Sequence, residues 1–180
     1  LSLHDALPIW KHGRDLPWRR TSDPYKILVS EVMLQQTQAA GVVPKWRDFI
    51  DEFPTPQACA ASPLGDVLRR WQGLGYPRRA RNLHAAATEV ARLGAFPDTL
   101  EGLLNLPGVG AYTARAVLAF AFEHDAAVVD TNIARVYARV AGVRLTQRRE
   151  RGPVVVGADL AASEVNKHIR EDIEKNMELT

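Results

Sequence analysis

Glu31 is the first residue whose type and position could carry acid–base chemistry. It lies in a stretch that indicates a helix, one turn away from Ile27, Leu28 and Leu34. Residues three and four apart share a helix face, so this carboxyl should face the packed side. Burial disfavours the charged form and raises a carboxyl pKa, as a general acid at neutral pH requires. A lone Glu on such a face is more often a structural residue, so both roles stay open at this point.

Asp130 is a second carboxylate, and it directly precedes the segment TNIARV. An Asp at such a position is a preferred helix N-cap, which accounts for it without any chemistry. Taken singly, neither Glu31 nor Asp130 is evidence of catalysis.

The sequence LPGVG at 106–110 predicts a tight turn between two helices. Gly108 and Gly110 permit backbone conformations that other residues resist, and the next helix begins at once with its free amides exposed. Such a turn presents N–H groups to an anion, and the helix dipole adds favourable partial charge. The pattern is typical of a helix-hairpin-helix, which holds one backbone phosphate in nucleic-acid enzymes, often with a bound monovalent cation. An ordinary turn between helices is the alternative.

The segment GLGYPRRARNLH at 73–84 places Tyr76 at the tip of a glycine-loosened loop, with Arg78, Arg79 and Arg81 following. A wedge side chain beside phosphate-seeking arginines is how proteins kink DNA and expose a base. A solvated helix face with a capping loop is the alternative. The expected helix that contains Glu31 has a polar end, formed by Gln35, Gln36, Thr37 and Gln38. These side chains could fill the gap left by an extruded base, or they could simply be exposed.

The charge of the chain is uneven although its net value is only +2. Residues 11–151 hold 20 Lys and Arg against 14 Asp and Glu, whereas the rest hold 3 against 7. Arginine makes up 18 of the 23 basic residues, and its planar fork suits phosphate. A polyanionic partner is therefore plausible for the middle of the chain.

The composition excludes several classes of protein. With 180 residues and 46% hydrophobic side chains, the chain should fold as one domain. No apolar run approaches the length of about 18 residues that a membrane span needs. The single cysteine, Cys59, excludes a disulfide scaffold and any multi-cysteine metal site.

Helix signals dominate the chain, and the valine-rich runs are too short to build a sheet. The predicted fold class is all-α. The predicted helices cover 24–40, 44–51, 62–72 with Ser62 as cap, 77–93, 98–105 with Asp98 as cap, 111–123, 131–141 and 159–177.

In order along the chain, five segments together resemble one family closely: LPWR at 16–19, DPYKILVSEVMLQQTQ at 23–38, GLGYPRRARNLH at 73–84, LPGVGAYTARAV at 106–117 and VVDTNIARVYAR at 128–139. They look like successive motifs of adenine DNA glycosylases of the MutY type, within the helix-hairpin-helix glycosylase superfamily. The resemblance covers residues 10–145, which we expect to form the glycosylase core as a multi-helix bundle.

The resemblance implies roles for four residues. Glu31 matches the general acid that protonates the adenine, and Asp130 matches the carboxylate that stabilises the oxocarbenium character of the sugar. Two carboxylates flanking a glycosidic bond, one neutral and one ionised, suit such cleavage. Asn132 matches a residue that positions this site. Tyr112 stands where bifunctional relatives such as endonuclease III have a Schiff-base lysine, which implies a monofunctional glycosylase.

The expected partner is double-stranded DNA carrying an adenine mispaired with 8-oxoguanine or guanine, bound by a monomeric, cytoplasmic protein with no membrane contact. A thymine or uracil mismatch glycosylase and a non-catalytic DNA-binding fragment are the alternatives. The candidate DNA-binding residues are Trp18, Arg19, Gln35, Gln36, Tyr76, Arg78, Leu106, Gly108, Val109 and Gly110.

The chain also departs from the family. Family members continue into a segment whose four cysteines hold a [4Fe-4S] cluster, and this sequence lacks those ligands. The only cofactor expected is a monovalent cation at the 106–110 turn. Residues 1–9, LSLHDALPI, are expected to be an artefact or disordered, and 146–180 a divergent tail. We therefore expect a truncated or chimeric fragment of such an enzyme.

Overall fold

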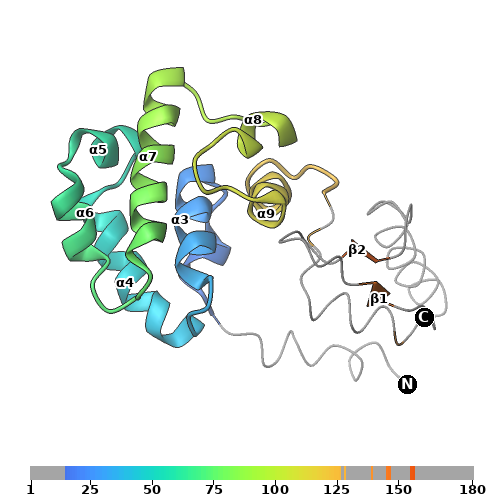
Figure 1. The fold of residues 1–180 in the computed structure, drawn as a ribbon, viewed down its shortest axis with the longest axis horizontal. Helices are drawn as coiled ribbons and strands as arrows, with labels where there is room; N and C mark the ends of the chain where they lie inside the picture. The colour runs from blue at the N-terminus through green and yellow to red at the C-terminus, as the bar shows by residue number, and fades with distance from the viewer. Residues whose placement is uncertain (1–14, 127, 129–138, 140–144, 147–154, 157–180) are drawn as a thin grey trace. The chain divides into compact units, whose positions relative to one another are not determined.

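A computed structural model gives the fold of the chain (Figure 1). It divides into two units, Arg20–Val128 and a second one formed by Leu1–Arg19 with Val129–Thr180. The residues that the structure describes are 15–126, 128, 139, 145–146 and 155–156. The expected extents of core and tail, 10–145 and 146–180, stay predictions.

The unit Arg20–Val128 is helical throughout its regular elements. Its α-helices are α3 (Pro24–Leu34), α4 (Ala39–Glu52), α5 (Pro56–Ala61), α6 (Leu64–Arg70), α7 (Pro77–Leu93), α8 (Leu100–Leu104) and α9 (Ala111–Ala121). Helix α7 runs between α5 and α6 on one side and α3 on the other (Figure 1). Helix α3 also packs against α4 and α9, which makes it the central helix of this unit.

The described residues also contain a 3₁₀ turn and one pair of short strands. A 3₁₀ turn, η1 (Pro17–Arg20), precedes α3. In the second unit, β1 (Leu145–Thr146) pairs antiparallel with β2 (Val155–Val156), with Leu145 opposite Val156. These two-residue strands are the only ones in the described part of the chain, and the all-α fold class is confirmed.

The sequence explains why α3 begins where it does. Asp23 is its N-cap, and the side chain accepts hydrogen bonds from the backbone N–H groups of Tyr25 at 2.9 Å and Lys26 at 3.3 Å. Pro24 occupies the first helical position, where its missing N–H costs nothing. The helix then buries residues on several faces, including Leu28 and Met33. This burial fits a helix enclosed by α4, α7 and α9.

The single helix predicted over 24–40 is wrong. Helix α3 ends at Leu34, Gln36 takes a left-handed conformation with φ +57°, and α4 begins at Ala39. Helix α4 therefore starts five residues before the predicted 44–51 helix and contains Pro44, at the cost of one backbone hydrogen bond.

Three other predicted boundaries differ from the structure. Ser62 was predicted to cap the helix over 62–72, but it is the C-cap of α5, a helix that was not predicted. The N-cap of α6 is Pro63. Thr99, rather than Asp98, caps α8 by accepting from the Gly102 N–H. Helix α9 ends two residues before the predicted end at 123.

The 77–93 helix is confirmed with the predicted bounds. The helices predicted over 131–141 and 159–177 lie outside the described residues, apart from helical Arg139. None of the helices in the described ranges is long and apolar enough to cross a membrane.

Candidate DNA-binding and catalytic site

Glu31 is half-buried in α3, as its position on the packed face predicts. Neighbours one turn away, Ile27 and Leu28, are fully buried. Burial raises the pKa of the Glu31 carboxyl from 4.5 to about 7. A carboxyl with this pKa is partly protonated near neutral pH, so it can deliver a proton to a leaving group.

Asp130 and Asn132 lie outside the described residues. The pairing of a neutral Glu31 with an ionised Asp130 therefore stays a prediction, which rests on the matched VVDTN segment.

The predicted turn between two helices is present at 106–110. The Val109 N–H donates to the Leu106 carbonyl at 3.1 Å, and Gly108 has φ +76°. The side chains of Leu106 and Val109 are buried, while Gly108 and Gly110 are exposed. Leu106 and Val109 thus anchor the turn, and the surface it offers to a phosphate is mainly backbone.

Helix α9 begins directly after this turn. Its N-cap is Gly110, which has no side chain to cap the first amides of the helix. Uncapped amides and the positive end of the dipole suit an anion. Tyr112 lies in the first turn and is 40% exposed, so its side chain is accessible beside this helix end.

The side chain of Asn82 in α7 lies directly against the turn at Gly108. An added Cβ atom at Gly108 would meet the Cβ and Nδ2 atoms of Asn82 at 2.5 Å. Asn82, Gly108 and Gln35 also line one small cavity of about 20 Å³. The turn, the start of α7 and the end of α3 are therefore close neighbours.

A cleft of about 490 Å³ lies where the end of α3 faces the start of α7. Four predicted DNA-binding residues line it, namely Gln35, Gln36, Tyr76 and Arg78, together with Arg79 and Asn82. Tyr76 is 62% exposed and, like Gln36, has a positive φ, +47°. Strained backbone of this kind tends to occur at functional sites. The structure thus brings together two segments that are distant in the sequence.

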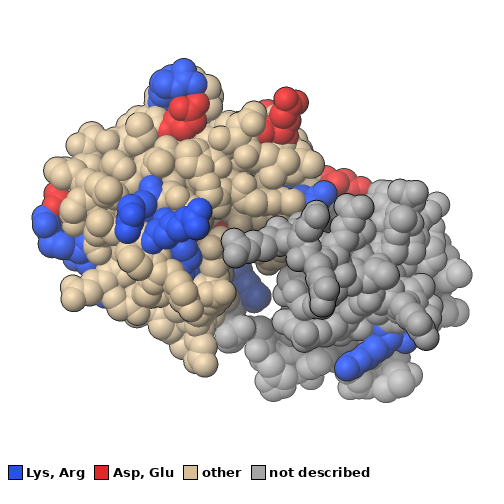
Figure 2. Space-filling model, viewed as in Figure 1, with Lys and Arg blue, Asp and Glu red and all other residues tan. Residues whose placement is uncertain are grey.

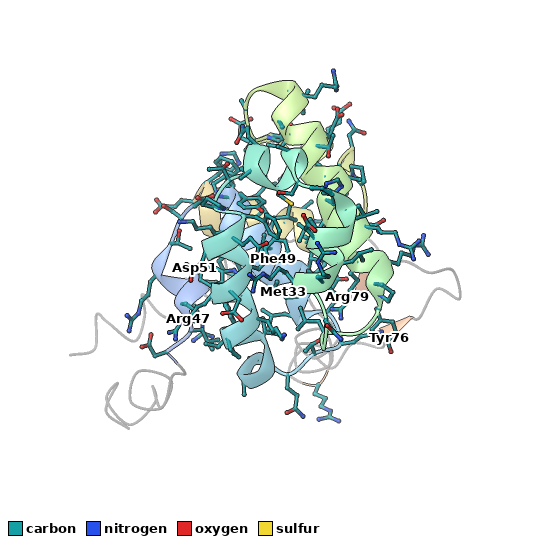
Figure 3. The ribbon with its side chains drawn as sticks, turned by 90° about the vertical axis from the view of Figure 1, so that its left-hand side faces the viewer. Met33, Arg47, Phe49, Asp51, Tyr76 and Arg79 are labelled. Atoms are coloured by element: carbon teal, nitrogen blue, oxygen red, sulfur yellow. The ribbon has the colours of Figure 1, made fainter. Side chains whose placement is uncertain are left out.

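Arg79 differs from the arginines beside it. Its guanidinium donates to the carbonyl oxygens of Val32 at 3.0 Å, Met33 at 3.2 Å and Gln35. Arg78 and Arg81 are exposed, whereas Arg79 is not. In Figure 3, Tyr76 lies at the outer edge and Arg79 lies inward of it, toward Met33. The expectation of three phosphate-seeking arginines is therefore corrected for Arg79, whose Nη1 and Nη2 donors are taken by the protein.

Basic side chains gather on the visible face of the helical unit. Figure 2 shows Lys and Arg over the N-terminal half of α7, and both basic and acidic side chains at the upper edge. A basic surface beside the cleft would favour a polyanion.

Trp18 and Arg19 belong to the other unit. Trp18 is buried and Arg19 is exposed. Their expected contacts with DNA stay predictions.

The residues of this chain do not fit a [4Fe-4S] cluster. The sequence has one cysteine, Cys59, and its side chain is fully buried on α5. The described residues contain no group of three or more His, Cys, Asp and Glu side chains that could hold a metal. The monovalent cation expected at 106–110 stays a prediction.

Sequence reasoning missed Asn82 as part of the site, and it assigned Arg79 to phosphate contacts rather than to contacts within the protein. A signal for Arg79 was present, because it lies one turn before Leu83 and two before Ala86 on the buried face of α7. For Asn82 the only signal was its place in the motif.

Comparison with known proteins supports the resemblance. The family described as "HhH-GPD superfamily base excision DNA repair protein" matches residues 29–151. An adenine DNA glycosylase of Mycobacterium tuberculosis is 55% identical over 129 residues, which cover 70% of this chain and 42% of that protein. The human adenine DNA glycosylase is 43% identical over 141 residues, covering 72% and 26%. The chain spans less than half the length of these two relatives.

Solved structures show the same fold. A thermostable thymine-DNA glycosylase matches with a TM-score of 0.67 and 35% identity, covering 73% of this chain and 62% of that one. An endonuclease III–DNA complex matches with a TM-score of 0.67 and 24% identity, covering 94% and 73%. The glycosylase resemblance inferred from the five motifs is confirmed.

Proposed function

Because the chain belongs to the HhH-GPD superfamily of base excision DNA repair proteins, we propose that it releases mispaired adenine from duplex DNA by cleaving the N-glycosidic bond. The observation that carries this proposal is the half-buried position of Glu31 in α3, within the residues 29–151 that match the family, where burial raises the pKa of its carboxyl. The proposed mismatch is adenine opposite 8-oxoguanine or guanine, and the proposed enzyme is a monomer.

The reaction starts from a neutral Glu31. Its carboxyl proton passes to the adenine ring, the bond between C1′ of the sugar and N9 of the base breaks, and the electron pair leaves with the base. Water then adds to C1′ and gives a proton to the Glu31 carboxylate, which completes the abasic product. Asp130 stabilises the positive charge that develops on the sugar, and Asn132 positions the site. Both roles rest on the matched VVDTN segment.

Tyr112 makes the enzyme monofunctional. It stands at the start of α9, where lyase relatives have an amine, and a phenol cannot form an imine with the abasic sugar. The strand should therefore stay intact until alkali cuts it.

The cleft and the turn bind the DNA. A base inside a duplex cannot reach a buried carboxyl, so the nucleotide must be extruded. Tyr76 is exposed enough to enter the base stack, Gln36 faces it across the cleft, and Arg78 neutralises phosphate. The backbone at 108–110, together with the start of α9, holds a phosphate.

A second candidate is removal of thymine or uracil from mismatches. The similarity to a thermostable thymine-DNA glycosylase, at 35% identity, supports this second candidate. The two candidates differ in the base released, not in the fold.

Base release from defined duplexes tests the proposal. Duplexes with 8-oxoguanine:adenine, guanine:adenine, guanine:thymine and guanine:uracil are incubated with the chain and then heated in alkali, which cuts abasic sites. We expect cleavage at adenine and a loss of at least about 100-fold in single-turnover rate for Glu31→Gln, the usual range for a lost general acid. Release of thymine or uracil alone would establish the second candidate. Release at an unchanged rate by Glu31→Gln would remove Glu31 from the reaction.

A further inference from the structure

Arg79 holds the two walls of the cleft together. On one wall, its Nη1 atom donates to the Val32 and Met33 carbonyls at 3.0 and 3.2 Å and to that of Gln35. On the other wall, Nη2 donates to the Leu74 carbonyl at 2.7 Å and to that of Gly75 at 3.4 Å. One guanidinium therefore ties the end of α3 to the loop that carries Tyr76.

The carbonyls of Val32 and Met33 lie in the last turn of α3, where a helix offers them no backbone amide to accept from. The last carbonyls of a helix have no amide to accept from, and a cation is favoured at that end of the dipole. The Arg79 fork satisfies several of them at once, and Nη2 also lies 3.4 Å from Thr37 Oγ1. Arg79 thus fixes the turn at 35–37 that separates α3 from α4.

Two aromatic rings contact the Arg79 guanidinium. The Arg79 Cζ atom lies 5.6 Å from the centre of the Trp71 ring and 5.4 Å from that of Tyr76. The Trp71 indole N–H in turn donates to the Gly75 carbonyl at 3.0 Å. Arginine stacks on aromatic faces more favourably than lysine does, so these contacts select a planar fork.

Both walls contain backbone that needs support. Gln36 has φ +57° and Tyr76 has φ +47°, which are unfavourable conformations for residues with a side chain. Such conformations persist only where the surroundings impose them. Arg79 binds the carbonyls of Gln35, Leu74 and Gly75, which directly precede these two residues. It is therefore placed to impose both left-handed conformations.

We propose that Arg79 is a positioning residue that sets the separation of Gln36 and Tyr76, and thereby controls extrusion of the base rather than cleavage of its bond. This inference rests on the proposed function. Arg79 acts through Gln36 and Tyr76 and makes no contact of its own with the base. Removing it lets the two walls move apart, and a paired base is then extruded less often.

Two variants separate this role from general loss of structure. Arg79→Met removes the fork and keeps most of the length. Arg79→Lys keeps the charge, but one ammonium cannot serve both walls. The control is Arg92→Met on the same helix, because Arg92 is exposed and pairs only with Glu89 among the described residues.

The first measurement is amide hydrogen exchange of the free chain, which needs no activity. In Arg79→Met, exchange at 35–37 and 73–76 should rise by about tenfold or more, while α9 stays unchanged. Unchanged exchange at both walls would overturn the inference. The result holds whether or not the chain releases adenine.

The second measurement compares adenine in a mismatch with adenine in a single-nucleotide bulge, which is already extrahelical. Arg79→Met and Arg79→Lys should slow single-turnover release from the mismatch by about 10- to 100-fold and from the bulge by less than about threefold. Equal losses on both substrates, or full rescue by Arg79→Lys, would overturn the inference. If the unaltered chain releases adenine from neither duplex, the proposed function fails, and hydrogen exchange alone decides whether Arg79 joins the walls.

Discussion

The side chain of Asn82 occupies the space that a side chain at Gly108 would need. A Cβ atom on Gly108 would lie 2.5 Å from the Cβ and Nδ2 atoms of Asn82, closer than any van der Waals contact allows. Gly108 also has φ +76°, a conformation that favours glycine. Conformation and space therefore both require glycine at this point of the turn before α9.

Gly108→Ala should lower the free energy of unfolding by roughly 2 to 4 kcal/mol, from strained backbone and overpacking together. Urea unfolding followed by circular dichroism measures this. The matched control is Gly110→Ala, where φ is −94° and nothing lies within 4 Å of the added atom. It should cost less than about 1 kcal/mol. Equal losses in the two variants would contradict the role assigned to Asn82.

Glu31 should make stability depend on pH. Its pKa is about 7 in the folded chain against 4.5 ordinarily, so the folded state holds the proton more tightly. Below about pH 4.5 both states are protonated, and between 4.5 and 7 the unfolded state loses its proton first. The free energy of unfolding should therefore fall as pH rises through this window, by at most about 3.5 kcal/mol at about 1.4 kcal/mol per pKa unit.

Glu31→Gln should remove this pH dependence, because the amide does not titrate. The measurement is the free energy of unfolding at a series of pH values between 4 and 8 for both proteins. Glu101→Gln, at an exposed carboxylate of α8, is the control and should retain the dependence. Parallel curves for the unaltered chain and Glu31→Gln would contradict the burial of the carboxyl.

The sequence predicted those features that depend on local signals. The bounds of α7 follow from Pro77 at its start and Gly94 at its end, and both residues act locally. The position of Glu31 on the packed face of α3 follows from the spacing of apolar residues along that helix. Both predictions need only the chain within a few turns.

Features set by distant contacts could not be predicted in this way. Helix α3 ends at Leu34 although nothing in 35–40 breaks a helix, and Arg79 binds its last carbonyls from across the cleft. The same contact removes Arg79 from the arginines that face solvent. The spacing of Arg79 from Leu83 and Ala86 indicates the buried face of α7, but it does not predict which carbonyls the guanidinium binds.

Cys59 should report on opening of the helical core. Its side chain is fully buried, and burial raises the pKa of the thiol to about 11. Because the thiolate is the reactive form, a disulfide reagent at pH 8 should react at least about 100-fold more slowly with the folded chain than with the chain in guanidinium chloride. The release of the coloured thiol from Ellman's reagent measures both rates. Rapid reaction in native buffer would show that α5 does not stay packed.

Tyr112→Lys should give the chain some ability to form an imine with the abasic sugar. The side chain is 40% exposed in the first turn of α9, beside amides that suit a phosphate, so an amine there can reach the product. Reduction with borohydride should trap a covalent adduct between protein and DNA, seen as a shifted band on a denaturing gel. The control is Phe120→Lys, which places an exposed amine on the same helix two turns away and should give no adduct. A Tyr112→Lys variant that releases adenine but forms no adduct would contradict the alignment of Tyr112 with the lysine of the lyase relatives.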